Sequence, residues 1–482
     1  MILRITGDIS RTYCQNLCLI YFPGAKFPED EAETENSDIA EVELVLSDEA
    51  YESRVKIISG GQSFFGQGMC DTTTHTSDRA KKLAVGKAFH KAGAALRGES
   101  SPWGILTGVR PAKIAAELME SGLSVEQTVN ELENDYLLRS DKAALLTEVV
   151  KRQEYARTLI GKDTCSLYVS IPFCPTRCAY CSFVSFSTPR YLSTLPAYMD
   201  KLCEDIKRAC REISESGQRL VSVYVGGGTP TVLDEMQLKR LLLTITEGIK
   251  DHNILEFTVE AGRPDTVTKE KFDIMTSYGV NRTSINPQIL DDNVLKVIGR
   301  GHTVEQFYRA FEIARKSGIR SINTDLIAGL PSSSLEGFCS TVDKIAELNP
   351  ENVTVHTYCV KRAATFTSEA HEEGDKRGIY SFNGGITGDC VDYAQKKLKE
   401  CSYFPYYLYR QKNAQGNLEN VGFTREGYEG LYNIFIMEEL QSICAVGAGA
   451  VSKIVGDKGE KIKRIFEPKY TYEYINKAVK QH

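Results

Sequence analysis

The sequence predicts an α/β protein whose central part is a partial (β/α)6 barrel on the plan of a TIM barrel. Short apolar runs rich in β-forming residues alternate there with longer segments of helical character. The runs cover residues 166–173, 220–228, 255–261, 281–286, 321–331 and 352–360. Strand, helix and strand at this spacing indicate right-handed crossovers and a parallel sheet. Six such units suit an open or partial barrel, and the chemistry of these folds collects at the carboxyl ends of the strands.

Two glycines mark the ends of predicted helices in this region. Gly279 and Gly318 each follow a helical stretch and precede an apolar residue. Glycine is common at this position because it readily adopts the left-handed conformation that ends many helices. The two segments therefore read as repeats of one helix-to-strand junction.

The chain is expected to divide into three regions. Residues 1–160 read as an N-terminal α+β domain, residues 161–365 as the barrel core, and residues 366–482 as a C-terminal covering and substrate region. In the first region strand candidates precede helices, with strands at 1–8, 17–22 and 40–48 and helices from 77–98 to 147–160. The acidic run at residues 29–38 is expected to be a solvated loop.

Composition and charge narrow the class of protein. Lysine and arginine number 58 against 64 aspartate and glutamate, and the net charge of −6 argues against a protein that coats nucleic acid. The 14 cysteines are scattered, the N-terminus has no signal pattern, and no apolar run approaches the ~20 residues of a membrane span. We therefore expect a cytoplasmic protein with no membrane span and no nucleic-acid partner.

Three cysteines follow the first barrel strand in a C-x3-C-x2-C spacing: Cys174, Cys178 and Cys181. Structural zinc sites usually take four ligands from two C-x2-C pairs, and no second pair follows here. Clusters of the 4Fe–4S type normally take four cysteines. Three cysteines therefore predict such a cluster with one iron open to a ligand that carries an amine and a carboxylate, as S-adenosylmethionine does. The alternative is three unrelated cysteines in a loop.

Two further features lie at the ends of the next strands. Gly226, Gly227 and Gly228 end the second strand, but no Lys-Ser/Thr follows them as in a Walker motif. Glycines there let the backbone approach a ligand closely, a plain tight turn being the alternative. Glu260 ends the third strand, where a carboxylate either pairs with the ammonium group of a cofactor or forms an ion pair at the barrel rim.

The stretch from Tyr168 to Cys181, "YVSIPFCPTRCAYC", resembles the start motif of the radical S-adenosylmethionine (SAM) superfamily. Within it the chain is similar to the oxygen-independent coproporphyrinogen III oxidases, in a longer subgroup with an N-terminal extension. Their motif has the form Y-x-H-I-P-F-C-x3-C-x-aromatic-C. Ser170 stands at the position of the histidine, and Phe183 stands where well-known bacterial members carry a fourth cysteine. Neither departure touches the three expected cluster ligands.

The resemblance implies a set of cofactor contacts. Tyr168 would lie beside the sulfonium of SAM, Glu260 and the glycine loop would hold its aminoacyl end, and Val451 would touch its adenosyl part. A second SAM would be held by Gln288, Arg300, Asp325 and Cys359. The whole set of implied cofactor-binding residues is Tyr168, Tyr180, Gly227, Gly228, Thr229, Glu260, Gln288, Arg300, Asp325, Cys359 and Val451.

The implied activity is the oxygen-independent oxidative decarboxylation of coproporphyrinogen III in haem biosynthesis. A 5′-deoxyadenosyl radical would take hydrogen from a propionate, which would lose carbon dioxide and an electron and become a vinyl group; two rounds give protoporphyrinogen IX. A reduced flavodoxin or ferredoxin-type protein would donate the electron for SAM cleavage. Basic and aromatic candidates for the tetrapyrrole pocket are Lys361, Arg362, Tyr406, Tyr407, Tyr409, Arg410 and Lys412, an ordinary amphipathic surface being the alternative.

Two other functions stay open. A relative of these oxidases carries haem and has a His-Asn-x-x-Tyr-Trp motif, whereas the aligned stretch from Tyr432 to Met437 has neither the histidine nor the tryptophan. Methylases and cyclopropane-forming members of the superfamily would apply the same radical chemistry to another substrate. The region around Trp103 and Arg110 is not part of the common core, and we expect it to serve structural packing.

Overall fold

The computed structural model describes residues 1–28, 37–181, 183, 185–359, 382–411, 414–456 and 461–477. Lys361, Arg362, Lys412 and residues 29–36 of the acidic run lie outside this part of the chain. The chain forms two compact units. One comprises the described residues of Met1–Lys151, Ser368–Asp389 and Leu408–Asn420, and the other those of Arg152–Thr367, Cys390–Tyr407 and Val421–His482. The expected division into three regions stays a prediction.

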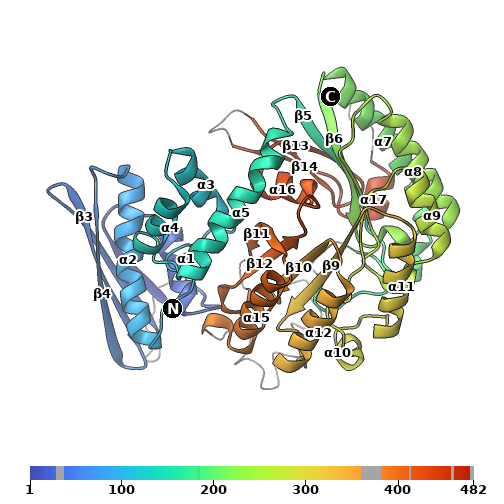
Figure 1. Cartoon of the computed structure of the whole chain (residues 1–482). Coiled ribbons are helices and arrows are strands. Elements are labelled where there is room, and N and C mark those ends of the chain that lie inside the picture. Colours follow the sequence, from blue (N-terminus) through green and yellow to red (C-terminus); the bar gives the residue numbers. More distant parts are fainter. Residues whose placement is uncertain are drawn as a thin grey trace. The chain divides into compact units, whose positions relative to one another are not determined.

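The first unit is built on a four-stranded sheet. Its elements are β1 (Ile2–Thr6), α1 (Arg11–Tyr21), β2 (Ile39–Ser47), β3 (Ala50–Ser59), β4 (Gln62–Asp71), α2 (Ser77–Arg97), α3 (Ala112–Glu120), α4 (Val125–Asn134) and most of α5 (Ser140–Thr158). The strands follow the order β1-β2-β3-β4, with β1 parallel to β2 and the other neighbours antiparallel. α2 lies across β3 and β4 (Figure 1). Helix and sheet approach closely, since a Cβ atom added at Gly66 of β4 would lie only 2.0 Å from the Ala88 carbonyl oxygen of α2.

The expectation of a strand at residues 17–22 was wrong, because most of this segment belongs to α1. Four apolar residues are buried at spacings of three and four, as on one face of a helix: Cys14, Leu17, Cys18 and Tyr21. The Ser10 side chain accepts a hydrogen bond from the Tyr13 N–H and caps the helix. The candidates at 1–8 and 40–48 are confirmed as β1 and β2, whereas β3 and β4 were missed.

The second unit contains the six predicted strands as neighbours in one sheet. They are β5 (Thr164–Ile171), β6 (Arg219–Gly227), β7 (Glu256–Glu260), β8 (Arg282–Ser284), β9 (Ser321–Ala328) and β10 (Asn352–Thr357). Each pairs parallel to the next along the chain. Among the described residues no pairing closes this sheet into a ring. The prediction of a partial (β/α)6 barrel is confirmed.

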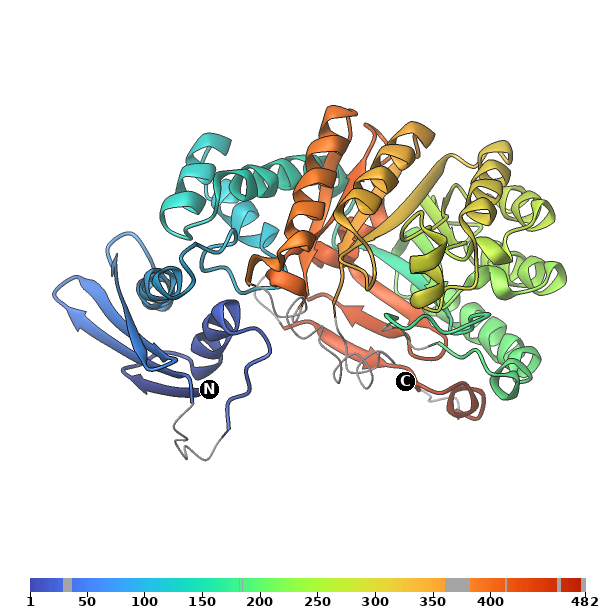
Figure 2. The same cartoon turned by 90° about the horizontal axis from the view of Figure 1, so that it is seen from below.

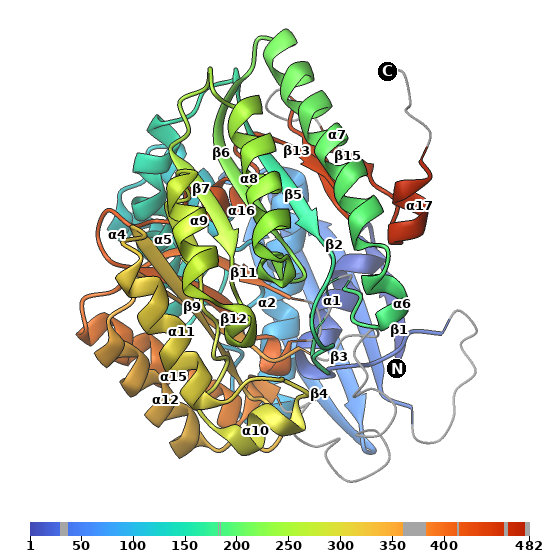
Figure 3. The same ribbon diagram turned by 90° about the vertical axis from the view of Figure 1, so that its right-hand side faces the viewer.

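Helices connect these strands. They are α6 (Pro189–Leu192), α7 (Leu195–Glu215), α8 (Glu235–Gly248), α9 (Lys269–Ser277), α10 (Asp292–Val297), α11 (Val304–Lys316) and α12 (Leu335–Leu348), with short 3-10 turns η1 (Pro230–Val232) and η2 (Pro264–Thr266). Figure 3 shows α7, α8 and α9 in front of β5, β6 and β7, and Figure 2 shows the green and yellow helices ranged along one side of the sheet. Gly279 and Gly318 follow α9 and α11 with φ of +79° and +76°, so both predicted junctions are confirmed.

The sheet continues beyond the six predicted strands at both edges. Next to β5 lie β13 (Ser442–Val446), β14 (Val451–Ile454) and β15 (Lys463–Phe466), with β13 parallel to β5. Next to β10 lie β12 (Glu419–Thr424) and β11 (Phe404–Arg410), with β12 antiparallel to β10. The remaining elements are η3 (Phe382–Gly384), α15 (Ile386–Glu400), η4 (Gln415–Asn417), α16 (Leu431–Glu438) and α17 (Thr471–Ile475). No described helix is both long and apolar enough to cross a membrane.

Strand β11 contains four of the candidates for the tetrapyrrole pocket, Tyr406, Tyr407, Tyr409 and Arg410. Tyr406 and Tyr407 are buried within the sheet, and the Tyr407 hydroxyl donates to Thr354 Oγ1 of β10 at 3.4 Å. Tyr409 is half-buried. Arg410 is buried and donates to the Asn417 carbonyl oxygen at 3.0 Å. These side chains serve packing because a strand covered on both faces buries aromatic residues at successive positions.

A buried charge pair lies in the first unit. Lys142 and Glu419 are fully buried, with Lys142 Nζ 2.7 Å from Glu419 Oε1. The indole N–H of Trp103 donates to the other carboxylate oxygen at 2.7 Å. The Arg410 guanidinium lies 5.1 Å from the centre of the Trp103 ring. Trp103 therefore has the packing role expected for its region.

We predict that Lys142→Met destabilises the first unit by roughly 3–5 kcal/mol, because it leaves the buried Glu419 carboxylate without its cation. Trp103 is the only tryptophan of the chain, so its fluorescence reports the urea-induced unfolding of this unit. The control is Lys91→Met at an exposed position of α2, where we expect a change within about 0.5 kcal/mol. Lys142→Met/Glu419→Leu should recover much of the loss. Equal unfolding midpoints for the two single variants would contradict the prediction.

Candidate cofactor site at the strand ends

The cysteine loop follows β5 and lies at the carboxyl end of the sheet. Cys174 and Cys178 are buried and Cys181 is half-buried, and all three are free thiols. The Ala179 N–H donates to the Ile298 carbonyl oxygen at 3.0 Å, which ties the loop to the segment after α10. The loop thus presents its three thiols from a backbone that the rest of the unit holds in place.

The sulfur atoms have polar and cationic neighbours. Cys174 Sγ lies 3.3 Å from Thr229 Oγ1. The guanidinium groups of Arg263 and Arg300 donate to Cys178 Sγ at 3.7 and 3.9 Å. Burial raises the pKa of the Cys174 thiol to about 11, and the hydrogen bond from Thr229 opposes that rise. Cations and hydrogen-bond donors favour the thiolate, which is the form that binds metal.

The glycine loop after β6 packs directly on the cysteine loop. The Gly228 N–H donates to the Ile171 carbonyl oxygen and the Thr229 N–H to that of Phe173, both at 2.8 Å. A Cβ at Gly228 would lie 2.5 Å from the Phe173 oxygen, and Gly227 has φ of +107°. Only glycine fits this close approach of the two loops without strain, and the expected approach of this backbone to a ligand stays a prediction.

Glu260 lies at the end of β7 beside the glycine loop. Its carboxylate accepts a hydrogen bond from the Tyr224 hydroxyl at 2.5 Å. A Cβ at Gly226 would lie 3.0 Å from the same carboxylate. Burial raises the pKa of Glu260 to about 7, while the hydrogen bonds from Tyr224 and the Gly227 N–H lower it. Within the described ranges of the chain no cationic side chain forms an ion pair with Glu260, so a cationic ligand group would stabilise the charged form of this carboxylate.

The rings of three tyrosines, two from strands and one from a helix, stack next to Glu260. The ring centres of Tyr224 and Tyr432 lie 4.4 Å apart, and those of Tyr168 and Tyr224 lie 6.1 Å apart. Tyr168 and Tyr224 occupy paired positions of β5 and β6, whereas Tyr432 comes from α16. The predicted cofactor residue Tyr168 therefore belongs to an aromatic wall of this site.

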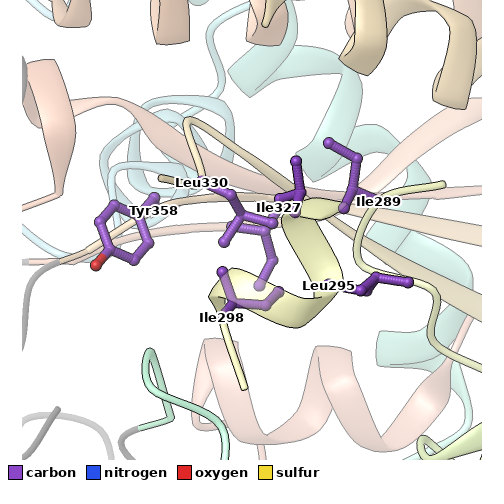
Figure 4. Packing of buried hydrophobic residues seen from close by; sticks show 7 residues of the cluster. Ile289, Leu295, Ile298, Ile327, Leu330 and Tyr358 are labelled. Carbon is purple, nitrogen blue, oxygen red and sulfur yellow. The ribbon is translucent and has the colours of Figure 1, made fainter. Parts of the chain in front are cut away.

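Arg300 is buried and joins several parts of the site. Its guanidinium donates to the Tyr180 hydroxyl at 2.8 Å and to the carbonyl oxygens of Gly262 and Asn286 at 2.5 and 2.7 Å. An apolar cluster lies just before Arg300 in the chain, and Figure 4 shows its members Leu295 and Ile298 near Ile327 and Leu330. The Tyr180 ring packs against this cluster. The apolar packing thus holds Tyr180, whose hydroxyl in turn accepts the hydrogen bond from Arg300.

Gln288 and Asp325 meet across the ends of β8 and β9. The Gln288 N–H donates to the Asp325 carbonyl oxygen at 3.0 Å, and Gln288 has φ of +65°, which costs energy for a residue with a side chain. The Asp325 carboxylate accepts from the side-chain amides of Asn286 and Asn323 at 2.8 and 2.7 Å. Burial alone would raise the pKa of Asp325, but hydrogen bonds, including one from His356, lower it.

The last two predicted residues lie on the flanking strands. Cys359 is buried two residues after β10 ends, beside Tyr358 of the apolar cluster. Val451 begins β14 and pairs with Phe466 of β15. Its contact with an adenosyl group stays a prediction.

Ser170, which replaces the expected histidine, bonds to the loop before β14. The Ser170 hydroxyl donates to the Ala448 carbonyl oxygen at 2.9 Å. The Tyr198 hydroxyl donates to the Ser170 carbonyl oxygen at 2.8 Å and accepts from the Ala448 N–H at 3.0 Å. The residue is therefore a structural link between β5 and the loop that follows β13.

The residues at this edge suit a 4Fe–4S cluster and SAM. Three thiols close to one another in a loop are soft ligands for iron. Among the described residues, the buried polar atoms at the site without a hydrogen-bond partner include Ser284 Oγ, Gln288 Oε1 and Arg300 Nε. Buried polar groups are normally paired, so these atoms are available to a bound polar molecule.

Comparison with known proteins gives the family. Residues 168–345 match the family model of the Radical SAM superfamily. The chain is 39% identical over 381 residues to the oxygen-independent coproporphyrinogen-III oxidase-like protein HemZ of Bacillus subtilis, covering 78% of this chain and 75% of that protein. The chain belongs to the oxygen-independent coproporphyrinogen III oxidase family of radical SAM proteins. The cofactors of this superfamily are a 4Fe–4S cluster and SAM, as the start motif predicted.

Other relatives in this family carry a different name. The heme chaperone HemW of Lactococcus lactis is 30% identical over 295 residues, which cover 60% of this chain and 70% of that protein. Among solved structures, coproporphyrinogen III oxidase (HemN) of Escherichia coli matches with a TM-score of 0.51 at 23% identity, covering 68% of this chain and 71% of that one. This structural likeness confirms the fold of the family.

Several residues of the site were missed by the sequence reasoning. Arg263, Tyr224, Asn286 and His356 contact predicted residues, yet none belongs to the start motif or was carried over from the family. Each lies on or just after a predicted barrel strand. Their position near the carboxyl ends was the available signal, because side chains there converge on the mouth.

We predict that SAM binds more weakly as the pH falls below about 7. The Glu260 carboxyl, with a pKa of about 7, must then lose a proton before it pairs with the ammonium group of SAM. The dissociation constant should rise toward about tenfold for each pH unit below that pKa. Equilibrium dialysis of SAM against the cluster-loaded protein measures this.

Two variants test the assignment of that pH dependence. Glu260→Gln should bind SAM weakly and lose the dependence. Tyr224→Phe removes a hydrogen bond that lowers the Glu260 pKa, so the pH at which binding weakens should move upward. A dissociation constant that does not change in this range in the unmodified protein would overturn the prediction.

Proposed function

We propose that the protein converts propionates of coproporphyrinogen III to vinyl groups without oxygen and so forms protoporphyrinogen IX. The observation that carries this proposal is the meeting of the three thiols, the glycine loop and the Glu260 carboxylate at one edge of the sheet. The names of the B. subtilis and E. coli relatives supply the substrate class.

The protein residues bind, orient and exclude water in this proposal. When bound, the cluster and SAM supply a 5′-deoxyadenosyl radical that takes hydrogen from a propionate, which then loses carbon dioxide and one electron. Cys174, Cys178 and Cys181 hold the cluster, and Glu260 pairs with the ammonium group of SAM. The backbone of the glycine loop and the ring of Tyr168 position the same molecule. Fixed orientation of this kind contributes much of the rate of radical transfer.

A second SAM is the proposed ligand of the neighbouring group of residues. Asp325 is held charged by amide donors and suits ribose hydroxyls, and Arg300 suits a carboxylate. Gln288 Oε1 is buried and has no hydrogen-bond partner in the part of the chain that the structure describes, so it can accept a hydrogen bond from this ligand. Cys359 lines the same proposed site, whereas Val451 is assigned to the first SAM.

A low-potential one-electron carrier of the flavodoxin or ferredoxin type is the proposed donor. Thr176 and Arg177 are exposed and belong to the cysteine loop itself. The exposed surface of this loop is therefore only one or two residues away from the thiols along the chain, so a donor bound there would be close to the cluster. The proposed tetrapyrrole substrate is a small molecule, and no nucleic-acid partner is proposed.

The experiment that tests the function is an anaerobic turnover assay. The cluster is reconstituted, reductant, SAM and coproporphyrinogen III are added, and oxidised porphyrins and nucleosides are separated by chromatography. We expect protoporphyrin together with 5′-deoxyadenosine, and loss of both in Cys174→Ala. Cys203→Ala, which changes another buried cysteine on α7, should retain both products.

Two outcomes would remove parts of the proposal. 5′-Deoxyadenosine without any decarboxylated porphyrin would keep the radical chemistry and discard this substrate, as for a methylase or cyclopropane-forming enzyme. Absence of both products from protein with a full cluster would favour the second candidate.

Haem binding is the second candidate, since the L. lactis heme chaperone is 30% identical over 70% of its length. Tyr432 stands where the chaperone motif has its histidine, and it is buried with its ring stacked on Tyr224. Burial raises the pKa of the Tyr432 hydroxyl well above its ordinary value. A tyrosine that stays protonated is a poor axial ligand for haem iron, so the geometry disfavours this candidate.

We predict no tight stoichiometric haem binding. A titration followed by visible spectra should show no saturable Soret shift at one haem per chain. Tyr432→His restores the residue of the motif and is the positive comparison. Tight haem binding by the unmodified protein would contradict this prediction. His356 is a half-buried histidine beside Asp325. If His356→Ala then lost the haem, His356 would be the iron ligand, and a haem-carrying function would be favoured.

A further inference from the structure

Arg263 connects the cysteine loop to the strand that carries Glu260. It lies three residues after Glu260 and only 3% of its surface is exposed. Asp265 fixes one side of its guanidinium, with Nε 3.0 Å from Oδ1 and Nη2 3.1 Å from Oδ2. Such a two-point contact sets the plane and direction of the guanidinium, which a single contact would not do.

The other side of the guanidinium faces the loop between Cys174 and Cys178. Arg263 Nη2 donates to Thr176 Oγ1 at 3.0 Å and Nη1 donates to the Thr176 carbonyl oxygen at 3.3 Å. Nη1 also donates to Cys178 Sγ at 3.7 Å. One side chain therefore holds the middle of the C-x3-C segment and one of its sulfur atoms.

The three thiols differ in their surroundings. Cys178 receives N–H groups from two cations, because Arg300 Nη1 lies 3.9 Å from the same sulfur. The neutral Thr229 hydroxyl is the side-chain partner of Cys174. His302 lies close to both guanidinium groups, is 3% exposed and adds no third cation, since burial and the two arginines lower its pKa to about 2.

We propose that Arg263 is a positioning residue that holds the Cys174–Cys178 loop and raises the reduction potential of the cluster bound there. A hydrogen-bond donor and a positive charge at a ligand sulfur stabilise the state that carries one more electron. Asp265 orients the donor and Thr176 anchors it to the loop. The inference rests on the proposed assignment of the three cysteines as ligands and is independent of the substrate.

The test compares Arg263→Gln and Arg263→Lys with the unmodified protein, without porphyrin. After anaerobic reconstitution, iron content is measured and the midpoint potential is determined by redox titration monitored by electron paramagnetic resonance. We expect Arg263→Gln to shift the one-electron equilibrium about tenfold toward the oxidised state, or about 59 mV to lower potential. Arg263→Lys keeps the charge and loses the two-point contact, so its shift should be smaller.

Arg282→Gln is the matched control for the loss of a buried arginine. Arg282 is 5% exposed, and its guanidinium donates to Ser321 and Asn352 at the start of two strands rather than to the cysteine loop. Its potential should equal that of the unmodified protein. An unchanged potential in cluster-loaded Arg263→Gln, or an equal shift in Arg282→Gln, would overturn the proposal.

A second measurement covers the case in which Arg263→Gln does not load the cluster. Amide hydrogen exchange of the peptide that contains Cys174 to Cys178 is followed in the apoprotein by mass spectrometry. Loss of the charge-assisted hydrogen bonds from Arg263 that hold this loop should increase the exchange rate about tenfold, with the peptide around buried Cys203 as internal reference. An exchange rate of the loop equal to that of the unmodified apoprotein would overturn the proposal. Neither measurement depends on turnover, so failure of the porphyrin assay would leave this result standing.

Discussion

Parallel pairing of β5 through β9 is the constraint on which the site depends. The register places Ile171 opposite Gly227, Glu260 opposite Ser284, and Ser284 opposite Asn323. Residues far apart in the chain therefore reach one edge of the sheet at the same level. Because side chains alternate between the two faces, a slip of one residue in any of these pairs would turn Glu260 or Asp325 away from the cysteine loop.

Three charged residues at this edge, Glu260, Asp325 and Arg300, form no carboxylate–guanidinium ion pair among the described residues. Glu260 has a hydroxyl as its side-chain partner, Asp325 has amides, and Arg300 has carbonyl oxygens and a hydroxyl. Unpaired buried charge costs free energy, which a zwitterionic ligand would recover by supplying opposite charges. The arrangement is therefore matched to SAM, which carries an ammonium, a carboxylate and a sulfonium group.

The sequence predicted the strand order and the ligand loop better than it predicted the packing around them. Alternation of strand and helix led to six neighbouring parallel strands, and spacing alone singled out Cys174 and its two partners. Local patterns do not distinguish a buried strand from an amphipathic surface segment, so the sequence did not predict β11. Arg263 was missed for a different reason: a single arginine in a loop carries no periodic signal, and its partners Thr176 and Cys178 are more than 80 residues away in sequence.

The replacement of histidine by Ser170 is best explained by the packing of the C-terminal strands. A Cβ at Gly447 would lie 2.6 Å from the Ser170 carbonyl oxygen, and Gly447 has φ of +100°. The backbone after β13 thus approaches β5 so closely that the Ser170 hydroxyl reaches the Ala448 carbonyl oxygen directly. The glycine at residue 447 is required by the backbone of residue 170, because its Cβ would clash with that carbonyl oxygen whatever side chain residue 170 carried. The Ser170 hydroxyl adds a hydrogen bond between strand and loop at this point, so the departure from the family motif is a feature of how β13 joins the sheet.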